Sequence, residues 1–404
     1  MDVRDTFVLD GHIVDSLILP KVLDLVLDAG CDYELIDVEI GRSPTDTSRA
    51  VLQVTAPDEA TLAAVAEQLR VQGANPATVD DATTHPAPAD GVAPADFCAT
   101  TNLDTEVRIG GRWVPADRAE MDCVLVVGAD ERVTTTPLHR IRSGDRVVVG
   151  AAGVRVRPAD RPRAAAGFEF MDSEVSSEKP KATQLRALAG RMRAVRDEGG
   201  SILVVAGPVV IHTGGGPPLA RLVRAGWVQT LFAGNGFATH DVESAVMGTS
   251  LGVSVASGQG TEGGHSNHLR VINEVRRHGS IAAAVASGWL TDGVMHALVT
   301  TGVPFVLGGS VRDDGPLPDT ITDVVATADR MRDEVAGVRL ALMLASTLHA
   351  VATGNVLPAA VETFCVDINP SVVTKLGDRG SHQAHGIVTD VGPFLALLAD
   401  ELGA

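Results

Sequence analysis

Aromatic residues are scarce in this chain, and no block of basic residues offsets its acidic side chains. Aromatics make up 3% of the 404 residues, so hydrophobic cores must be built mainly from Ala, Val, Leu and Ile. Lys and Arg number 33 against 51 for Asp and Glu, which gives a formal net charge of −18 at pH 7. Because such a surface repels phosphate backbones, we expect no nucleic-acid partner. The length is sufficient for several domains.

Long hydrophobic runs are also missing. The longest, such as residues 202–211, fall far short of the roughly 20 residues that a membrane-spanning helix requires. The N-terminal sequence MDVRDTFVLDG is acidic and lacks the basic flank of a secretory signal. We therefore expect a cytoplasmic protein without a membrane partner.

Cysteine pairs of the CxxC type are absent, which argues against a zinc knuckle and against a disulfide framework. Cys31, Cys98, Cys123 and Cys365 lie far apart, and we expect reduced, mostly buried thiols. Cys365 lies within an apolar run and is expected to be a core residue rather than a nucleophile. The GxSxG and GxxxxGK[ST] motifs are also absent, which disfavours serine hydrolases and P-loop NTPases.

The N-terminal part of the chain divides into two zones. Residues 1–95 show strands and amphipathic helices in the order strand, helix, strand, strand, helix, followed by a connector at 74–95 rich in Pro, Ala and Asp. This order predicts a ferredoxin-like α+β domain. Residues 96–175 show short strands with turn residues, which predicts a small β-module and a linker. Either zone is explained as a folding or oligomerisation scaffold or as part of a substrate pocket.

From residue 176 to 404, short apolar runs alternate with helical stretches. Near-continuous hydrophobicity is typical of strands buried on both faces, and helices between them indicate parallel crossovers. The fold class is therefore α/β, with a C-terminal Rossmann-like, doubly wound parallel sheet. The expected strands are 201–207, 228–234, 303–310, 338–346, 361–369 and 385–390, and the expected helices include 219–226, 268–279, 319–337 and 390–402.

Ligands of open parallel sheets bind beyond the carboxyl ends of the strands, near the switch in strand order. Small and acidic residues dominate these ends here, as a nucleotide requires. Asp367 follows Ser346 by 21 residues, which is the spacing of a ribose-binding acid in a dinucleotide fold, although GxGxxG is missing. The alternative is an Asp that caps the helix at Pro370. An acid at Asp367 favours NAD over NADP, whose additional phosphate it would repel.

Two further motifs remain open. The sequence HTGGG at 212–216 is either an anion-binding nest of backbone N–H groups or a flexible turn. His265 and His268 have the one-turn spacing of a metal pair, but no third ligand stands nearby, so we expect no metal.

The sequence resembles the archaeal-type ornithine cyclodeaminases over nearly its whole length. The same unit forms the C-terminal part of arginine dihydrolase/ornithine cyclodeaminase fusions, and the N-terminal zone is similar to the lysine-oxoglutarate reductase/saccharopine dehydrogenase-like domain of that family. The segments that carry the resemblance are TTNLDTEVRIGGRW (100–113), EMDCVLVV (120–127), FEFMDSEVSSEKP (168–180), VVAGPVVIHTGG (204–215), LFAGNGFATHDVE (231–243), GGHSNHLRVIN (263–273), GGSVRDDGPLPD (308–319), LMLASTLHAVATGN (342–355) and FCVDINPSVVTKLGDRGSHQAHGIVTDVG (364–392).

The resemblance implies an NAD-binding lyase of proline biosynthesis. Hydride leaves Cα of L-ornithine for NAD+, the δ-amine attacks the imine carbon, ammonia departs, and the cyclic imine takes the hydride back to give L-proline. The expected partners are this amino acid and further copies of the chain in a homo-oligomer. Because no arginine dihydrolase domain precedes the chain, arginine is not an expected substrate.

The resemblance also implies a set of site residues. An ornithine site needs a cation for the α-carboxylate, a carboxylate for the δ-ammonium and a base that frees an amine. The catalytic candidates are Arg312, Asp314, Glu262 and His265, with Lys179 and Asn102 as further candidates, and a loop salt bridge or cap explains each of them equally well. The cofactor is expected at Asn235, Gly236, Asp313, Met343, Ser346, Thr347, Leu348, His349, Asp367, Ile368, Asn369, Pro370, Asp390 and Val391.

Two rival functions remain compatible with the sequence. One is an NAD-dependent cyclodeaminase or dehydrogenase acting on lysine or another diamino acid. The length of the substrate pocket decides between these amino acids and ornithine, and the sequence does not give that length. The other is a non-catalytic NAD-binding regulatory protein. Following ammonia, proline and NADH in a mixture of the protein, ornithine and NAD+ separates all three.

Overall fold

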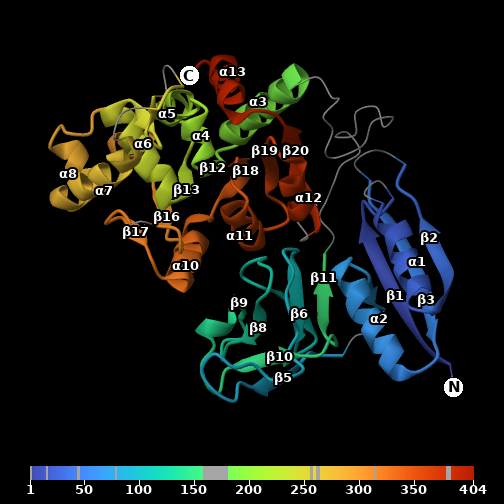
Figure 1. Cartoon of the computed structure of the whole chain (residues 1–404). Helices are drawn as coiled ribbons and strands as arrows, with labels where there is room; N and C mark the ends of the chain where they lie inside the picture. The colour runs from blue at the N-terminus through green and yellow to red at the C-terminus, as the bar shows by residue number, and fades with distance from the viewer. Residues whose placement is uncertain are drawn as a thin grey trace. The chain divides into compact units, whose positions relative to one another are not determined.

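The computed structural model of the chain describes residues 2–14, 17–42, 46–77, 80–157, 181–254, 258–260, 264–313, 315–378 and 384–404 (Figure 1). The chain divides into two compact units. The first contains residues 1–172 and 357–360, and the second contains 173–356 and 361–404. The domain boundaries expected near residues 95 and 175 stay predictions.

The first unit begins with a ferredoxin-like α+β fold. Its sheet has the order β2-β3-β1-β4 and is antiparallel throughout. Buried and partly exposed residues alternate along β3, as expected for a strand with one face on the core, which contains Phe7, Leu9 and Leu52. The prediction from the N-terminal pattern is confirmed. The elements are β1 (Val3–Gly11), α1 (Ile18–Asp28), β2 (Asp32–Glu39), β3 (Ser48–Ala56), α2 (Glu59–Val71) and β4 (Asn75–Pro76).

Two small antiparallel sheets form the β-module of the same unit, as the turn-rich sequence predicts. Their orders are β5-β10-β8-β9 and β11-β6-β7. Gly110 and Gly111 both have positive φ at the hairpin between β6 and β7, a conformation that favours glycine. The strands are β5 (Thr83–Pro86), β6 (Thr105–Ile109), β7 (Arg112–Pro115), β8 (Val124–Val127), β9 (Val133–Thr136), β10 (Arg146–Val149) and β11 (Val154–Val156).

The segment expected to be a connector, residues 74–95, contributes strands to both parts of the first unit. It contains β4 of the ferredoxin-like sheet and β5 of the β-module. These strands are too short and too polar to show the alternation by which longer strands are predicted. Polar side chains also link the two parts. Asn75 Nδ2 donates to Val156 O at 2.9 Å and Asn75 Oδ1 accepts from Val156 N at 2.8 Å, while the buried Arg70 donates to Ala99 O at 3.1 Å.

The second unit is a Rossmann-like domain around a parallel seven-stranded sheet. Its order is β17-β16-β13-β12-β18-β19-β20, so the strand order reverses between β12 and β18. The six strands expected from apolar runs are all present. The strands are β12 (Ser201–Ala206), β13 (Thr230–Gly234), β16 (Phe305–Gly308), β17 (Thr320–Ile321), β18 (Val338–Leu344), β19 (Glu362–Asp367) and β20 (Ala384–Val388), with a separate two-stranded hairpin of β14 (Thr249–Ser250) and β15 (Val253–Ser254).

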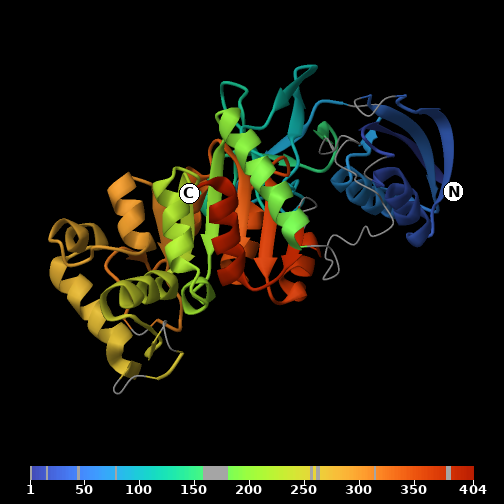
Figure 2. The ribbon, with the colours of Figure 1, turned by 90° about the horizontal axis from the view of Figure 1, so that it is seen from above.

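Helices cover both faces of this sheet (Figures 1 and 2). In both views α3, α5 and α13 lie on one face, and in Figure 1 α10, α11 and α12 lie on the other. The helix expected over 319–337 begins later, because Thr320–Ile321 pairs with β16 and Asp323 caps α10. The helices are α3 (Lys181–Asp197), α4 (Val209–His212), α5 (Gly216–Arg224), α6 (Asn235–Met247), α7 (Asn267–His278), α8 (Ile281–Ala286), α9 (Val294–Thr301), α10 (Val324–Glu334), α11 (Leu348–Val356), α12 (Pro370–Asp378) and α13 (Val391–Leu402).

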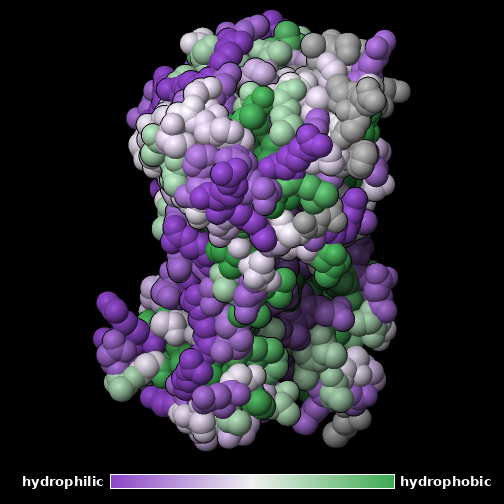
Figure 3. Space-filling model, turned by 60° about the vertical axis from the view of Figure 1, so that its left-hand side comes forward, coloured by the Kyte–Doolittle hydropathy of each residue, from purple (hydrophilic) through white to green (hydrophobic). Residues whose placement is uncertain are grey.

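The surface and the buried thiols agree with the composition. The face drawn in Figure 3 is mostly hydrophilic, and its apolar residues form small groups. All four cysteines are buried and free, and burial raises the pKa of Cys365 to about 12, with Asp367 acting in the same sense. This confirms that Cys365 is a core residue. No helix among the described residues is long and apolar enough to cross a membrane.

Candidate active site

The switch in strand order lies between β12 and β18, which is where an open parallel sheet binds its ligand. The loops that follow these two strands meet closely. A Cβ at Gly207 would lie 1.9 Å from the carbonyl oxygen of Ala345, so only glycine permits this approach. Ala345 itself has a left-handed φ of 45°, which turns the chain toward Ser346 and Thr347 before α11 begins.

His349, in the first turn of α11, lies over the carboxyl ends of two other strands. A Cβ at Gly234 would be 3.0 Å from His349 Cε1, and one at Gly308 would be 3.2 Å from His349 Nε2. Burial lowers the pKa of His349, while the carboxylate of Asp313 acts in the opposite direction. A neutral imidazole is therefore expected here at pH 7.

Asn235 and Gly236 form the start of α6, directly after β13. The side chain of Asn235 is buried, and its Oδ1 accepts from Leu317 N at 2.9 Å and from Thr320 Oγ1 at 3.2 Å. It therefore fixes the loop that follows β16. The N-cap residue, Gly234, has no side chain to cap the helix, so the first N–H groups of α6 remain available to an anion.

The loop after β16 carries Arg312 and Asp313. Asp313 Oδ2 accepts from Ser310 N at 2.8 Å, which fixes this turn. Arg312 is exposed, and its backbone N–H donates to Ser310 Oγ at 3.2 Å. The candidates Asp314, Glu262 and Lys179 and the side chain of His265 lie outside the described residues, so their roles stay predictions.

Asp367 lies at the carboxyl end of β19, as predicted. Its Oδ1 accepts from Asn369 N at 2.8 Å, a turn that precedes α12 at Pro370, while Oδ2 has no hydrogen bond with the described residues. The contact of Oδ1 therefore supports the interpretation of Asp367 as a residue that caps the helix at Pro370, and the open Oδ2 supports its interpretation as a ribose-binding acid. Asp390 caps α13 by accepting from Gly392 N at 3.0 Å, and Val391 begins that helix as a buried residue.

The 21-residue spacing from Ser346 to Asp367 assumes that β18 and β19 are the first two strands of a dinucleotide fold. The sheet has a different order. In the order of this sheet β12 is the first strand and β13 the second, and β13 ends at Gly234 and Asn235 without an acid. Asp367 ends the corresponding strand of the other half. The spacing from Ser346 therefore describes the second half of the domain.

Large apolar side chains are exposed at the carboxyl edge. Leu348 is 82% exposed after β18, and Ile368 is 74% exposed after β19. Val209 after β12 and Val311 after β16 are exposed as well. Exposed apolar groups at neighbouring strand ends suit flat heteroaromatic rings. Met343, by contrast, lies within β18 at 0% exposure, so its side chain belongs to the core.

The sequence HTGGG, for which an anion nest and a flexible turn were both open, forms a turn. The N–H groups of Gly214 and Gly215 donate to Ile211 O at 3.0 Å and Val210 O at 2.7 Å, so both are used to end α4. Pro217 and Pro218, in the first turn of α5, have no N–H to offer. The segment is a helix-ending turn, which was the alternative reading.

A polar cluster that the sequence did not reveal lies beside the first turns of α6. Glu243 is fully buried and accepts from His240 Nδ1 at 2.8 Å and Thr249 Oγ1 at 2.8 Å. The rings of His212 and His240 lie 4.9 Å apart, and those of His240 and His268 lie 6.2 Å apart. Within the described residues, no group of three or more His, Cys, Asp or Glu is arranged to hold a metal ion.

The comparisons with known proteins match this architecture. Residues 186–398 match the family described as the Rossmann fold of the C-terminal part of ArgZ-like arginine dihydrolases. Residues 104–185 match the first region of that part, and residues 4–103 match the conserved region of LOR/SDH bifunctional enzymes. An ornithine cyclodeaminase of Methanocaldococcus jannaschii is 50% identical over 98% of this chain and 95% of its own length. The chain belongs to the archaeal-type ornithine cyclodeaminase family.

Two solved structures extend the comparison. A LOR/SDH protein of Methanococcus maripaludis matches with a TM-score of 0.77 and 46% identity, over 80% of this chain and 99% of its own. AgrE, solved as a ternary complex with ornithine and NAD+, matches with a TM-score of 0.54 and 40% identity. That match covers 100% of this chain and 58% of AgrE. The cyclodeaminase family thus includes a member solved with both ligands.

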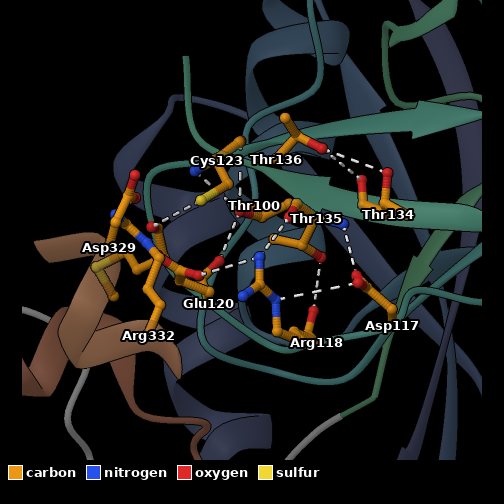
Figure 4. A network of polar contacts seen from close by, with 11 residues as sticks. Thr100, Asp117, Arg118, Glu120, Cys123, Thr134, Thr135, Thr136, Asp329 and Arg332 are labelled. Carbon is orange, nitrogen blue, oxygen red and sulfur yellow. Dashed lines mark hydrogen bonds and ion pairs between the residues drawn. The ribbon is translucent and has the colours of Figure 1, made fainter. Parts of the chain in front are cut away.

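In this member of the cyclodeaminase family, the first unit also carries a network of polar residues (Figure 4). Thr135 N donates to Asp117 Oδ1 at 2.8 Å, and Arg118 Nη2 donates to Thr135 O at 3.1 Å. Glu120 is buried, with its carboxylate 3.9 Å from Arg118 Nη2. Asn102, a further candidate, is buried in the same unit, where its carbonyl accepts from Ala359 N at 2.6 Å.

The residues that sequence reasoning missed share one property. Glu120, His240 and Glu243 all lie within quoted family segments. Arg118 is two residues from Glu120, and His240 and Glu243 have the i,i+3 spacing of one helix face. This spacing was an available signal, but exposed helix pairs share it, so it does not identify a buried cluster.

Proposed function

We propose that this chain is an NAD-dependent ornithine cyclodeaminase that converts L-ornithine to L-proline and ammonia. The observation that carries the proposal is the 50% identity, over 98% of the chain, to the ornithine cyclodeaminase of Methanocaldococcus jannaschii. The relative AgrE, solved with ornithine and NAD+, supports the cofactor. The carboxyl edge of the second unit offers groups that suit each part of NAD.

The residues present fit a dinucleotide. The uncapped N-terminus of α6, at Asn235 and Gly236, would take a phosphate on its free N–H groups. The free Oδ2 of Asp367 would accept a ribose hydroxyl, and Leu348 and Ile368 would cover the rings. Gly207, Gly234 and Gly308 keep the edge free of side chains that would otherwise fill it. The remaining proposed cofactor contacts are Asp313, Ser346, Thr347, His349, Asn369, Pro370, Asp390 and Val391, with Met343 restricted to its backbone.

When bound, NAD would supply the oxidant that takes a hydride from Cα of ornithine and returns it after ring closure. The chain's own residues would bind and orient the amino acid. The exposed guanidinium of Arg312 suits the α-carboxylate, because a planar pair of N–H groups matches two carboxylate oxygens. Asp314 remains the proposed partner of the δ-ammonium, with Glu262 and His265 as the further catalytic candidates.

Turnover without net redox change tests the proposal. Incubation with ornithine and a single equivalent of NAD+ is expected to give many equivalents of proline and ammonia without accumulation of NADH. Ornithine deuterated at Cα is expected to give proline that keeps the label, because the hydride returns to the same carbon. Accumulation of NADH with a keto acid, preferential turnover of lysine, or loss of the label to solvent would contradict it.

A further inference from the structure

The buried Glu243 is held as an ionised carboxylate. Its two oxygens accept four hydrogen bonds, from His240 Nδ1, from Thr249 Oγ1 at 2.8 Å, from Leu251 N at 3.1 Å and from Gly252 N at 2.9 Å. Burial alone would raise the pKa of Glu243, but the hydrogen bonds from His240, Gly252 and Thr249 outweigh burial and lower it. Four donors leave no position for a proton on the carboxyl group itself.

This arrangement fixes the tautomer of His240. Because Glu243 accepts at 2.8 Å, Nδ1 of His240 carries the hydrogen. The other nitrogen, Nε2, therefore presents its lone pair, because the hydrogen bond from Nδ1 to Glu243 is the one that the His240 side chain makes with the described residues. An imidazole held by a carboxylate at one nitrogen and open at the other is the arrangement of a general base.

The pair also lies on elements that follow two strands of the proposed cofactor site. His240 is in the second turn of α6, the helix that follows β13 and whose first residues are the proposed phosphate site. Its ring lies 4.9 Å from the ring of His212 on α4, the helix that follows β12. A Cβ at Gly236 would be 3.4 Å from Pro208 Cγ, so α6 starts against the residue that leads into α4. His240 thus belongs to the group of elements that follow the carboxyl ends of β12 and β13.

We propose that His240 is the general base of the cyclodeamination, with Glu243 as its positioning residue. Nε2 takes one proton from an ammonium group of ornithine, which leaves an amine with a free electron pair for attack. The imidazolium then gives this proton to the amino nitrogen that departs, so the C–N bond breaks to release neutral NH3, which takes up a proton once it is free. No proton is consumed overall, because cationic ornithine becomes neutral, zwitterionic proline and an ammonium ion. The inference rests on the proposed function.

The titratable groups that face His240 come from three helices. Glu243 faces it from its own helix, His212 from α4 and His268 from the start of α7. Burial and the neighbouring His240 lower the pKa of His212, while Glu243 acts in the opposite sense, and His212 Nδ1 lies 2.7 Å from Ser250 Oγ. A neutral His212 leaves Glu243 to stabilise the cation that forms on His240.

The substitution His240→Asn separates the chemical role from the structural one. The Asn amide nitrogen takes the place of Nδ1 and keeps the donor to Glu243, whereas Nε2 is lost. In the full-length enzyme we expect kcat for ornithine to fall by about 100-fold or more. NAD+ affinity by calorimetry and the thermal unfolding temperature should stay close to those of the unmodified enzyme. The matched control is His278→Asn on α7, where the imidazole also lies beside a glutamate of its own helix, Glu274, at 3.6 Å.

Further measurements test the role of His240 even where the His240→Asn variant fails to fold. In the unmodified enzyme, nitrogen-15 NMR should show His240 protonated at Nδ1, and a ring protonated at Nε2 overturns the proposal without any variant. Glu243→Gln should move the acidic limb of the kcat/KM profile to lower pH, because the ring loses its carboxylate. Proline formation with kcat retained in His240→Asn overturns this inference alone. An unmodified enzyme that forms no proline from ornithine overturns the proposed function as well.

Discussion

The two units of this chain use polar groups in opposite places. In the second unit the sheet is parallel and covered on both faces, and the polar residues Asn235 and Asp367 lie where two of its strands end. In the first unit the sheets are small and antiparallel, and Asn75 and Arg70 join one part to the next. The comparison teaches that short sheets need side chains to complete their hydrogen bonds, whereas a long parallel sheet leaves loop backbone and loop side chains available for a ligand.

Gly207→Ala should give the largest effect, because it removes the close approach at the switch in strand order. Its Cβ would lie 1.9 Å from Ala345 O, and backbone on both sides has to move. We expect a loss of about 4 kcal/mol or more in the free energy of unfolding, measured by chemical denaturation. Gly190→Ala is the control, since nothing lies within 4 Å of its Cβ in α3 and alanine favours a helix. Similar stabilities for both variants would show that the loops are not fixed there.

Asn75→Ala tests the corresponding feature of the first unit. The change leaves both the N–H and the C=O of the buried Val156 without their partner, at a cost of about 2–3 kcal/mol in the free energy of unfolding. Asn75→Asp is the comparison variant, because it keeps the acceptor for Val156 N but sets a carboxylate oxygen against Val156 O in place of the donor. Thermal and chemical unfolding should show a loss of stability in both variants. Equal stability of the unmodified protein and the alanine variant would refute the link.

The free energy of unfolding should depend on pH through the buried carboxyl group of Asp241 in the second unit. Burial raises its pKa from 3.8 to about 6, although hydrogen bonds from Met295 N and Val294 N oppose this shift. The folded state binds the proton more tightly, so this contribution to stability is present below about pH 4 and is lost as pH rises through about 6. The change is roughly 3 kcal/mol. Asp241→Asn should lack this fall, and a parallel pH profile in both proteins would contradict it.

Asp367→Ala tests the carboxyl edge as a binding surface and should have the smallest effect on folding. We expect NAD+ binding to weaken by about 1–3 kcal/mol, measured by calorimetry, because a charged hydrogen bond to the ribose is lost. The unmodified protein should prefer NAD+ to NADP+. Asp323→Ala is the comparison, since it removes the cap of α10 outside the proposed cofactor contacts and should cost about 1 kcal/mol of stability. Equal affinity for the two cofactors would defeat the role of Asp367.

Sequence patterns predicted those parts of the molecule whose signal is local. Apolar runs located the six strands of the Rossmann sheet, and alternation along residues 48–56 located a strand with one buried face. β4, β5 and β17 escaped because strands of two to four residues carry no periodicity. HTGGG was ambiguous because the same glycines serve a nest or a turn. His240 and Glu243 were missed because their i,i+3 spacing is also that of exposed helix pairs, and because His212, whose ring lies beside that of His240, is distant in sequence.

The link between Asn75 and Val156 also has a consequence for synthesis of the chain. The two residues are 81 positions apart, so the ribosome completes the ferredoxin-like fold well before it reaches β11. At roughly 5–20 residues per second, about 4–16 s pass between the two. During that interval the oxygen and one N–H of the Asn75 amide must be hydrated, whereas its other N–H binds Gly73 O and the Arg70 guanidinium binds Glu67 and then Ala99, 29 residues further on. The newly synthesised N-terminal fold therefore remains accessible to chaperones and proteases until β11 emerges and Val156 binds Asn75.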